Sequence, residues 1–470
     1  MDTINSMARS TQKMRRDVVG GKRGMGHQLQ RQRRRIHRPD PGRVGVGRPD
    51  ASLTSSSGLV PFGQFLRRLG VDRELAKRFG YLKQGRQVVY PMHAQMRLLL
   101  DANVLGELRV FGLEHCAADP LFVQLAGGTV PSIDTVYRDL QRFEQADLIS
   151  LESLMAIHGL WPSDLARHDV VHLDLDTTVE PLFGSQEGAL PGPNPRYHGR
   201  PSYHPILASI AETRTCVGAL LRPGNTSLGN ADAWYVDFVV RRVKQILRPD
   251  QTLRVRIDAA GDCTEILHTI HDQGAAFTVK ARLTDDLCRA VFAVADWRTV
   301  DADANGRPTR QVAEVPFQRG EWGHAGCTFR VVAVRERDST SGKQVLLWPD
   351  LDYSAKAFIT NDPATDPDDL ARNYEDRAGI EPLIAEFKHD LGIGKIPTDD
   401  FDANHAMLLL KLLTHNLVCR FVEHFAPQLR TWRLPWLRRA LFCVPGRLVR
   451  SGHRTSLRLP PLSHLHHLLN

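Results

Sequence analysis

Cysteine and long apolar runs are both scarce in this sequence. Its seven cysteines are scattered over 470 residues and none forms a CxxC pair, which argues against a disulfide framework and against a zinc site. No stretch approaches the roughly 18 consecutive apolar residues of a membrane span, and no signal-peptide pattern opens the chain. We therefore expect a cytoplasmic protein with reduced thiols and no membrane partner.

Acidic residues are absent from one end of the chain, although they are common elsewhere. Residues 424–470 carry eight arginines and no acid, and residues 1–50 carry 13 Lys/Arg against four Asp. Because the formal net charge of the chain is +8, the segment between them, residues 51–423, has a net charge of −9. Two basic ends suit a polyanion such as DNA, and an acidic centre suits divalent cations. A solvated tail is the alternative for residues 1–50.

A chain of 470 residues is long enough for two or three domains. Its first segment, residues 1–57, is rich in Arg, Gly and Ser, which predicts a basic disordered tail. Residues 58–165 carry apolar side chains at helical spacing and predict a helical DNA-binding domain. Within that domain, Ser132 follows a proline and is the predicted N-cap of a helix over residues 133–143.

Two arginines give this last helix a candidate function. Arg138 and Arg142 share one side of it with Thr135, as residues of a recognition helix do when a helix-turn-helix unit binds DNA. An ordinary amphipathic surface helix is the alternative interpretation.

Residues 166–281 alternate between strand and helix patterns. The predicted order is β-β-β-α-β-α-β, with elements at residues 170–179, 203–211, 215–221, 231–247, 253–258, 264–271 and 276–281. A three-stranded meander followed by an α/β crossover unit is typical of a ribonuclease H-like fold. The remaining segments are a β-rich insertion, the second part of the core and a basic, partly helical C-terminal region, at residues 282–356, 357–422 and 423–470. The predicted class is α/β: a ribonuclease H-like mixed sheet core with a β-rich insertion, a helical N-terminal domain and a helical C-terminal region.

Three carboxylates fall at matching places in this order. Asp176 lies on the first core strand, Asp258 ends the fourth, and Glu381 lies on a late helix. The carboxyl ends of adjacent strands meet at one sheet edge, so these side chains are expected to converge. Convergent carboxylates repel each other unless a cation is present, and two Mg²⁺ ions, with Mn²⁺ as an alternative, would support phosphoryl transfer there. Asp174 is the rival for the first position because it shares a strand face with Asp176.

The late helix carries the spacing Y-x2-R-x3-E-x6-K. Tyr374, Arg377, Glu381 and Lys388 then lie close to one helix face. A carboxylate flanked by two cations suits a metal-bound phosphodiester. Pro382 allows two interpretations, since it either occupies the first helical turn or kinks the helix.

Several stretches resemble bacterial insertion-sequence transposases of the DDE type, in the group with the YREK signature. They span about residues 130–420 and comprise residues 173–178, 186–188, 199–205, 221–226, 256–258 and 374–388. The resemblance implies catalytic Asp176, Asp258 and Glu381 with Mg²⁺, and phosphate contacts from Tyr374, Arg377 and Lys388. It also implies a homodimer on DNA that acts on terminal inverted repeats and target DNA, in a nucleoid-associated location.

Two further residues are candidate DNA contacts. Arg200 lies in a turn with two histidines and could hold a phosphate, although a structural turn is the alternative. Trp322 looks exposed within the insertion. Related hairpin-forming transposases stack a flipped base on an insertion aromatic, whereas a packed aromatic is the alternative for Trp322.

Three functions are compatible with these features. The preferred one is an active DNA transposase that cuts insertion-sequence ends and joins them to target DNA. A structure-specific DNA nuclease on the same fold is the second, but it needs neither the YREK spacing nor the insertion. A non-catalytic, transposase-derived DNA-binding protein is the third, and the presence of all three acids counts against it.

Overall fold

The first predicted core strand lies inside a mixed β-sheet whose strands fall between Val170 and Thr360. The computed structural model describes residues 45–461 apart from residues 193, 195–197, 324–327, 338–345, 349–352 and 453. Residues Ser52–Asn470 form one unit, separate from Met1–Ala51. Most of the predicted basic tail, residues 1–44, lies outside the described residues.

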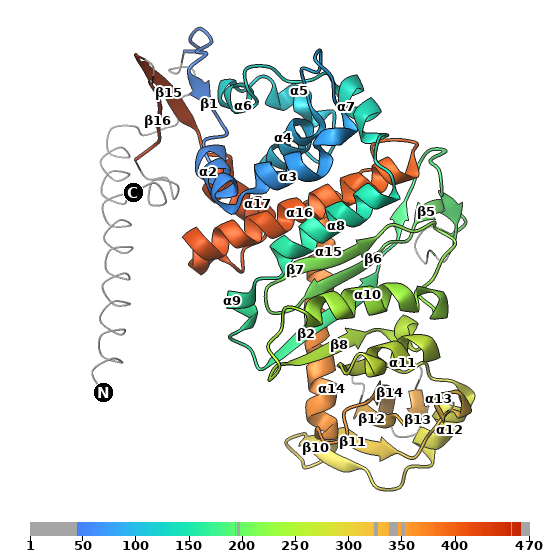
Figure 1. Ribbon diagram of the computed structural model, residues 1–470. Coiled ribbons are helices and arrows are strands. Elements are labelled where there is room, and N and C mark those ends of the chain that lie inside the picture. The colour runs from blue at the N-terminus through green and yellow to red at the C-terminus, as the bar shows by residue number, and fades with distance from the viewer. Residues whose placement is uncertain are drawn as a thin grey trace, which may run out of the picture. The chain divides into compact units, whose positions relative to one another are not determined.

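Five strands of this sheet form the core in the order β7-β6-β2-β8-β9, of which all but β9 are labelled in Figure 1. They are β2 (Val170–Thr177), β6 (Ile206–Ile210), β7 (Thr215–Leu220), β8 (Thr252–Ile257) and β9 (Ala276–Lys280). β2 pairs antiparallel with β6 and parallel with β8. The β6–β7 pair is also antiparallel, and the β8–β9 pair is also parallel. This is the ribonuclease H-like arrangement, so the predicted fold class is confirmed.

Helices cover both faces of the core strands, which explains the apolar strand sequences. One face packs on α10 (Ala233–Lys244) and α11 (Thr264–Asp272), and the other packs on α8 (Gln145–Gly159) and α16 (Phe401–Phe425). Successive residues of β7 accordingly face opposite sides of the sheet. Val217 packs in the hydrophobic cluster with α10 and α11, and Cys216 packs in the cluster with α8 and α16.

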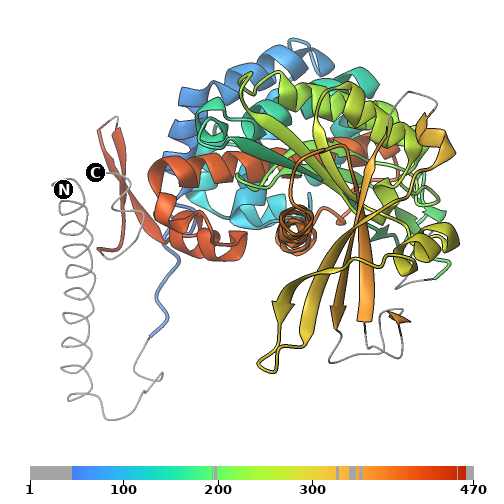
Figure 2. The same cartoon turned by 90° about the horizontal axis from the view of Figure 1, so that it is seen from below.

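The predicted insertion is β-rich, and its strands extend the core sheet rather than forming a separate sheet. β14 pairs antiparallel with β9, and the sheet continues through β12, β11 and β10 (Figure 2). The elements are α12 (Asp285–Phe292), β10 (Arg298–Ala302), β11 (Pro308–Val315), α13 (Gly320–Gly323), β12 (Arg330–Arg337), β13 (Leu346–Trp348) and β14 (Tyr353–Thr360).

The N-terminal part is helical, as predicted, and packs around α16. Its helices are α2 (Leu59–Leu69), α3 (Val71–Phe79), α4 (Met92–Leu105), α5 (Gly112–Cys116), α6 (Pro120–Leu125), α7 (Ile133–Leu140) and, after α8, α9 (Pro162–Leu165). The predicted N-cap is confirmed, since the Ser132 side chain accepts a hydrogen bond from the Thr135 backbone N–H. α7 ends at Leu140, three residues earlier than expected.

The C-terminal region is helical only in part. After α17 (Leu434–Leu437) the chain forms a hairpin of β15 (Gly446–Ser451) and β16 (Arg454–Arg458), and β15 also pairs with β1 (Leu53–Thr54). Gly452 lies in the hairpin turn at φ +59°, a conformation that glycine adopts without strain. None of the described helices has both the length and the apolar character needed to span a bilayer.

Helix α16 is buried along most of its length and carries polar groups inward. Asn416 joins three elements, because its amide bonds the backbone of Cys216 on β7 and the carbonyl oxygen of Met155 on α8. His405 and His415 are also buried, and so is His158 at the end of α8. Burial lowers the pKa of His405 to about 4, and the pKa values of His158 and His415 to about 3.

We expect these histidines to make the protein acid-sensitive. Each imidazole is neutral when folded but takes up a proton below about pH 6.5 when unfolded, so the stability it contributes is lost as pH falls from about 6.5 toward its folded pKa. The loss approaches about 1.4 kcal/mol per pH unit for each histidine. Urea unfolding between pH 7 and pH 5 checks this: His415→Gln should flatten the pH dependence, whereas a matched change at the exposed His424 of the same helix should not.

Candidate catalytic centre

Two of the predicted carboxylates meet at the ends of neighbouring parallel strands. Asp176 is the next-to-last residue of β2, and Asp258 directly follows β8. Burial raises the pKa of Asp176. Arg377 acts in the opposite direction, and the nearby charge of Asp258 raises this pKa further. The backbone orients both side chains, because Asp176 accepts a hydrogen bond from the Thr177 N–H (2.8 Å) and Asp258 accepts one from the Ala260 N–H (3.0 Å).

Asp174, the rival candidate, is occupied by another group. Arg256 lies opposite it on β8 and donates two hydrogen bonds to its carboxylate, Nε to Oδ1 at 2.6 Å and Nη2 to Oδ2 at 2.9 Å. Both side chains are only 3% exposed. Arg256 also donates to the carbonyl oxygen of Asn373, which ties this ion pair to the late helix. The ion pair leaves Asp176 as the candidate ligand on this strand.

The Y-x2-R-x3-E-x6-K segment is a chain of three short helices rather than one long helix. α14 (Pro367–Glu375) carries Tyr374, a 3₁₀ segment (Asp376–Gly379) carries Arg377, and α15 (Ile380–His389) carries Glu381 and Lys388. Pro382 lies in the first turn of α15, where a missing N–H costs little. The first of the two interpretations of Pro382 is therefore confirmed.

Arg377 connects this segment to the carboxylate pair. Its Nη2 donates to the carbonyl oxygen of Leu175 at 2.8 Å and lies 3.2 Å from Asp176 Oδ2. Tyr374 packs its ring against Phe358, with the ring centroids 4.8 Å apart. Burial raises the pKa of Tyr374 to about 12, so its hydroxyl stays protonated.

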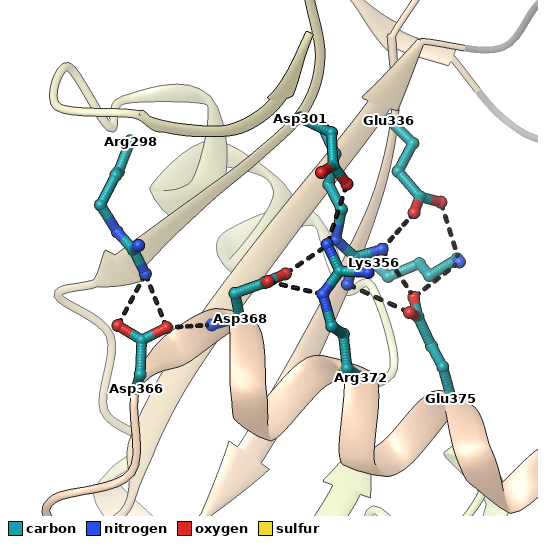
Figure 3. A network of polar contacts seen from close by, with 9 residues as sticks. Arg298, Asp301, Glu336, Lys356, Asp366, Asp368, Arg372 and Glu375 are labelled. Carbon is teal, nitrogen blue, oxygen red and sulfur yellow. Dashed lines mark hydrogen bonds and ion pairs between the residues drawn. The ribbon is translucent and has the colours of Figure 1, made fainter.

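A network of charges fixes α14 to the strands of the insertion (Figure 3). Arg310 of β11 lies at its centre, buried between Asp368 (2.9 Å), Glu375 (3.1 Å) and Glu336. Lys356 of β14 bonds both glutamates. Several shared carboxylates hold the helix more firmly than one exposed pair would, so the insertion positions the residues that follow α14.

Glu381 is exposed and remains outside the carboxylate pair. Within the described part of the chain, no three His, Cys, Asp or Glu side chains lie close enough together to hold a metal ion. The expected convergence is therefore reached by Asp176 and Asp258 only. The donor chemistry of this pair fits a hard divalent cation, and Glu381 lies one helical turn beyond Arg377, which itself contacts Asp176.

A groove of about 730 Å³ opens beside the end of β2. Lys388 lies in it and donates to Thr178 Oγ1 (3.0 Å) and to the carbonyl oxygen of Val179 (2.8 Å). Two exposed cations that sequence reasoning missed, Arg109 and Lys395, also line the groove. They come from separate loops, and no spacing in the sequence connects them.

A buried lysine belongs to the same electrostatic environment. Lys411 of α16 is fully buried and donates to the carbonyl oxygen of Gly392 at 2.5 Å. Burial lowers the pKa of Lys411 to about 7; Glu180 opposes the shift, and Arg109 and Lys395 add to it. The three cations therefore lie close enough to act on one another, and an anion in the groove would relieve their repulsion.

Two further candidates, Trp322 and Arg200, lie against aromatic rings. Trp322 was expected at the surface, but this was wrong: its side chain is 0% exposed, because Phe317 and Phe329 pack against its ring at centroid distances of 6.1 and 5.5 Å. The packed alternative is therefore correct, and no base can stack there. The Arg200 guanidinium stacks on the exposed ring of Phe183 at 4.4 Å.

The two arginines of the proposed recognition helix are exposed, but they differ in their contacts. Arg142 was expected on this helix but lies beyond its end at Leu140, and it donates to Asp139 in the last helical turn at 2.9 Å. Arg138 makes only a long contact, 3.5 Å, to Thr135 Oγ1 among the contacts found in the described residues. A role in DNA binding stays a prediction for both.

Fold and site together define an α/β protein with a ribonuclease H-like sheet and an aspartate pair at two adjacent strand ends. The chain belongs to the family described as transposase DDE domain group 1, whose profile matches residues 43–470. Curated proteins gave no match. Among solved structures, a cryo-EM structure of the piggyBac transposase synaptic complex with hairpin DNA is similar at 9% identity and a TM-score of 0.42, over 82% of this chain and 79% of that one.

Proposed function

We propose that this protein is an insertion-sequence transposase of the YREK group that cuts the ends of its element and joins them to target DNA. The observation that carries the proposal is the Asp176–Asp258 pair beside Arg377, in a chain of the DDE transposase family. The reaction is hydrolysis of a phosphodiester, followed by attack of the freed 3′-hydroxyl on a second phosphodiester. Two ends must be held together, so the acting species is proposed to be a homodimer on DNA, associated with the nucleoid.

In this proposal Asp176, Asp258 and Glu381 hold Mg²⁺, with Mn²⁺ as an alternative. When bound, the ions supply the positive charge that activates the attacking oxygen and stabilises the leaving one. Arg377 keeps Asp176 oriented through its 3.2 Å contact and adds a fixed charge beside the reacting phosphate. Glu381, exposed on the first turn of α15, is proposed to join the pair when the ions and DNA are bound.

The DNA strand is proposed to run through the groove beside β2. Lys388 and Tyr374 would contact phosphates next to the cleaved end, and Arg109 and Lys395 would contact phosphates further along. Exposed cations in a concave surface hold a polyanion without reading its sequence. Arg138, Arg142 and Arg200 are proposed as outer contacts to the terminal repeat.

The groove predicts a specific change in salt dependence. The double variant Arg109→Gln/Lys395→Gln should reduce the slope of log Kd against log salt by about 2, or roughly 0.9 for each lost phosphate contact. Fluorescence anisotropy with an end-sequence duplex in Ca²⁺ measures binding without cleavage. The matched control, Arg241→Gln/Arg289→Gln, removes the same charge from exposed helix pairs and should leave the slope unchanged. Equal slopes for both variants would contradict the proposal that DNA runs through the groove beside β2.

The function itself is tested with purified protein and duplexes that carry the two ends of the element. We expect strand cleavage at the ends and joining to a second DNA in Mg²⁺, and neither in EDTA. Cleavage of branched DNA without end specificity or joining would favour a structure-specific nuclease. End binding without cleavage in either Mg²⁺ or Mn²⁺ would favour a non-catalytic DNA-binding protein.

A further inference from the structure

A second cavity lies near the N-terminal end of β2, whereas Asp176 lies near the C-terminal end of this strand. It has a volume of about 220 Å³ and is bounded by the end of α8, the α9 segment, the β6–β7 turn, α16 and residues 430–437. The turn follows Ile210, which pairs with Leu173 of β2, whereas Asp176 pairs with Leu207 at the other end of β6. The cavity is therefore separate from the proposed catalytic centre.

Arg420 is the unusual residue in its wall. Its guanidinium carbon lies 3.4 Å from the centre of the Trp161 ring, and its Nη1 donates to His158 Nδ1 at 2.5 Å. Burial lowers the pKa of Arg420 to about 9, and only Asp164 acts against this shift. Among the described residues no carboxylate lies within ion-pair distance of Arg420.

Each carboxylate in the cavity wall is engaged by another group. Glu386 is 2.6 Å from Arg214 and accepts from the Leu434 N–H at 2.9 Å. Glu212 is 2.6 Å from His172. The other two acids, Asp164 and Glu423, both lie 3.7 Å from Arg167. Arg420 is thus a half-buried cation whose charge no neighbouring acid balances at close range.

Two buried N–H donors of the wall also lack an acceptor. They are Arg420 Nε and Trp161 Nε1, and neither has a hydrogen-bond partner in the described residues. An unmade hydrogen bond at a buried donor costs free energy, and an uncompensated charge costs more. A ligand that is negatively charged and accepts hydrogen bonds would remove both costs at once.

The rest of the wall restricts the ligand. Val418, Val422, Leu434 and Leu437 make part of it apolar. Four carboxylates line the cavity together with four arginines, one of which is Arg420. The formal charges of these acids and arginines cancel, so the wall suits a single negative charge better than a phosphate dianion. The volume also lies below the roughly 300–1,000 Å³ of sites for drug-sized ligands.

We propose that this cavity binds a small organic monocarboxylate, whose carboxylate pairs with Arg420 and accepts a hydrogen bond from Trp161 Nε1. Its apolar body contacts the aliphatic side chains of α16 and α17. Such a ligand would link α16 to the start of α9, because Arg420 lies on α16 and Trp161 is the N-cap residue of α9.

The test uses full-length protein, no DNA, and sodium benzoate as the probe, with sodium phosphate and sodium chloride at equal ionic strength. Titration calorimetry should detect binding of benzoate but not of phosphate or chloride, and saturation-transfer NMR should show saturation of the benzoate ring protons. Arg420→Met, which keeps the length of the side chain, should weaken benzoate binding on the order of tenfold or more. Trp161→Phe, which keeps an aromatic ring, should weaken it about fivefold. Arg439→Met is the matched control, since Arg439 is exposed and stacks on Trp436 outside the cavity.

Three results would overturn the proposal: no benzoate binding, equal binding by the Arg420→Met variant, or Arg420-dependent binding of phosphate in place of benzoate. If Arg420→Met does not fold, Trp161→Phe decides the question. The readout involves no strand cleavage, so failure here is distinct from failure of the transposase proposal.

Discussion

Replacing Glu381 with glutamine is expected to abolish excision of a marker placed between the ends of the element. Glutamine keeps the size of the side chain but loses the charge that a divalent cation requires of its ligand. A loss of several kcal/mol in transition-state stabilisation corresponds to a rate reduction on the order of 10³-fold or more. Excision frequency in cells measures this, and Asp176→Asn should have the same effect.

A nearby acid provides the control for this experiment. Asp376 is exposed on the 3₁₀ segment just before α15, so Asp376→Asn removes an equal charge from the same part of the chain. Its excision frequency should stay close to that of the natural chain. Excision by the Glu381→Gln variant at the natural frequency would refute Glu381 as a ligand.

Replacing Asp174 with asparagine is expected to destabilise the fold rather than the reaction. The change leaves the buried Arg256 guanidinium without its carboxylate, and removing one partner of a buried ion pair costs about 3–5 kcal/mol. The free energy of unfolding, measured with urea, should fall by that amount. By contrast, Asp176→Asn should unfold within about 1 kcal/mol of the natural chain, because it also removes the repulsion with Asp258.

Two further variants isolate the effect of the buried ion pair. Asp286→Asn breaks an exposed pair, in which both side chains are at least 75% exposed, and should cost no more than about 1 kcal/mol. The double replacement Asp174→Leu/Arg256→Met removes both charges and should recover much of the stability lost by Asp174→Asn. A double variant no more stable than Asp174→Asn would show that the pair stabilises the fold by more than charge neutralisation.

The order of the core strands along the chain was predictable because each strand has its own apolar pattern. The choice between Asp174 and Asp176 was not predictable, since the two share a strand face. Only the register that places Arg256 opposite Asp174 separates their roles, and register is a property of two strands together.

Burial and long-range contacts account for the other differences. Trp322 is flanked by glycine and charged residues, which suggested exposure, but Phe317 and Phe329, five and seven residues away, pack against its ring. Arg109 and Lys395 reach the groove from loops far apart in the sequence. Arg420 lies on a strongly apolar helix, and only its stacking on Trp161 singles it out.

The continuous sheet has a consequence for synthesis of the chain on the ribosome. Asp176 on β2 and Asp258 at the end of β8 are made early. By contrast, β14 must return across the whole insertion to pair with β9 before α14 can be anchored. Such non-local pairing is slow compared with local helix formation. The segment with Arg377 and Glu381 thus reaches its place only after the insertion is complete. A nascent or truncated chain that stops within the insertion therefore has the two aspartates but lacks Glu381, the proposed third ligand.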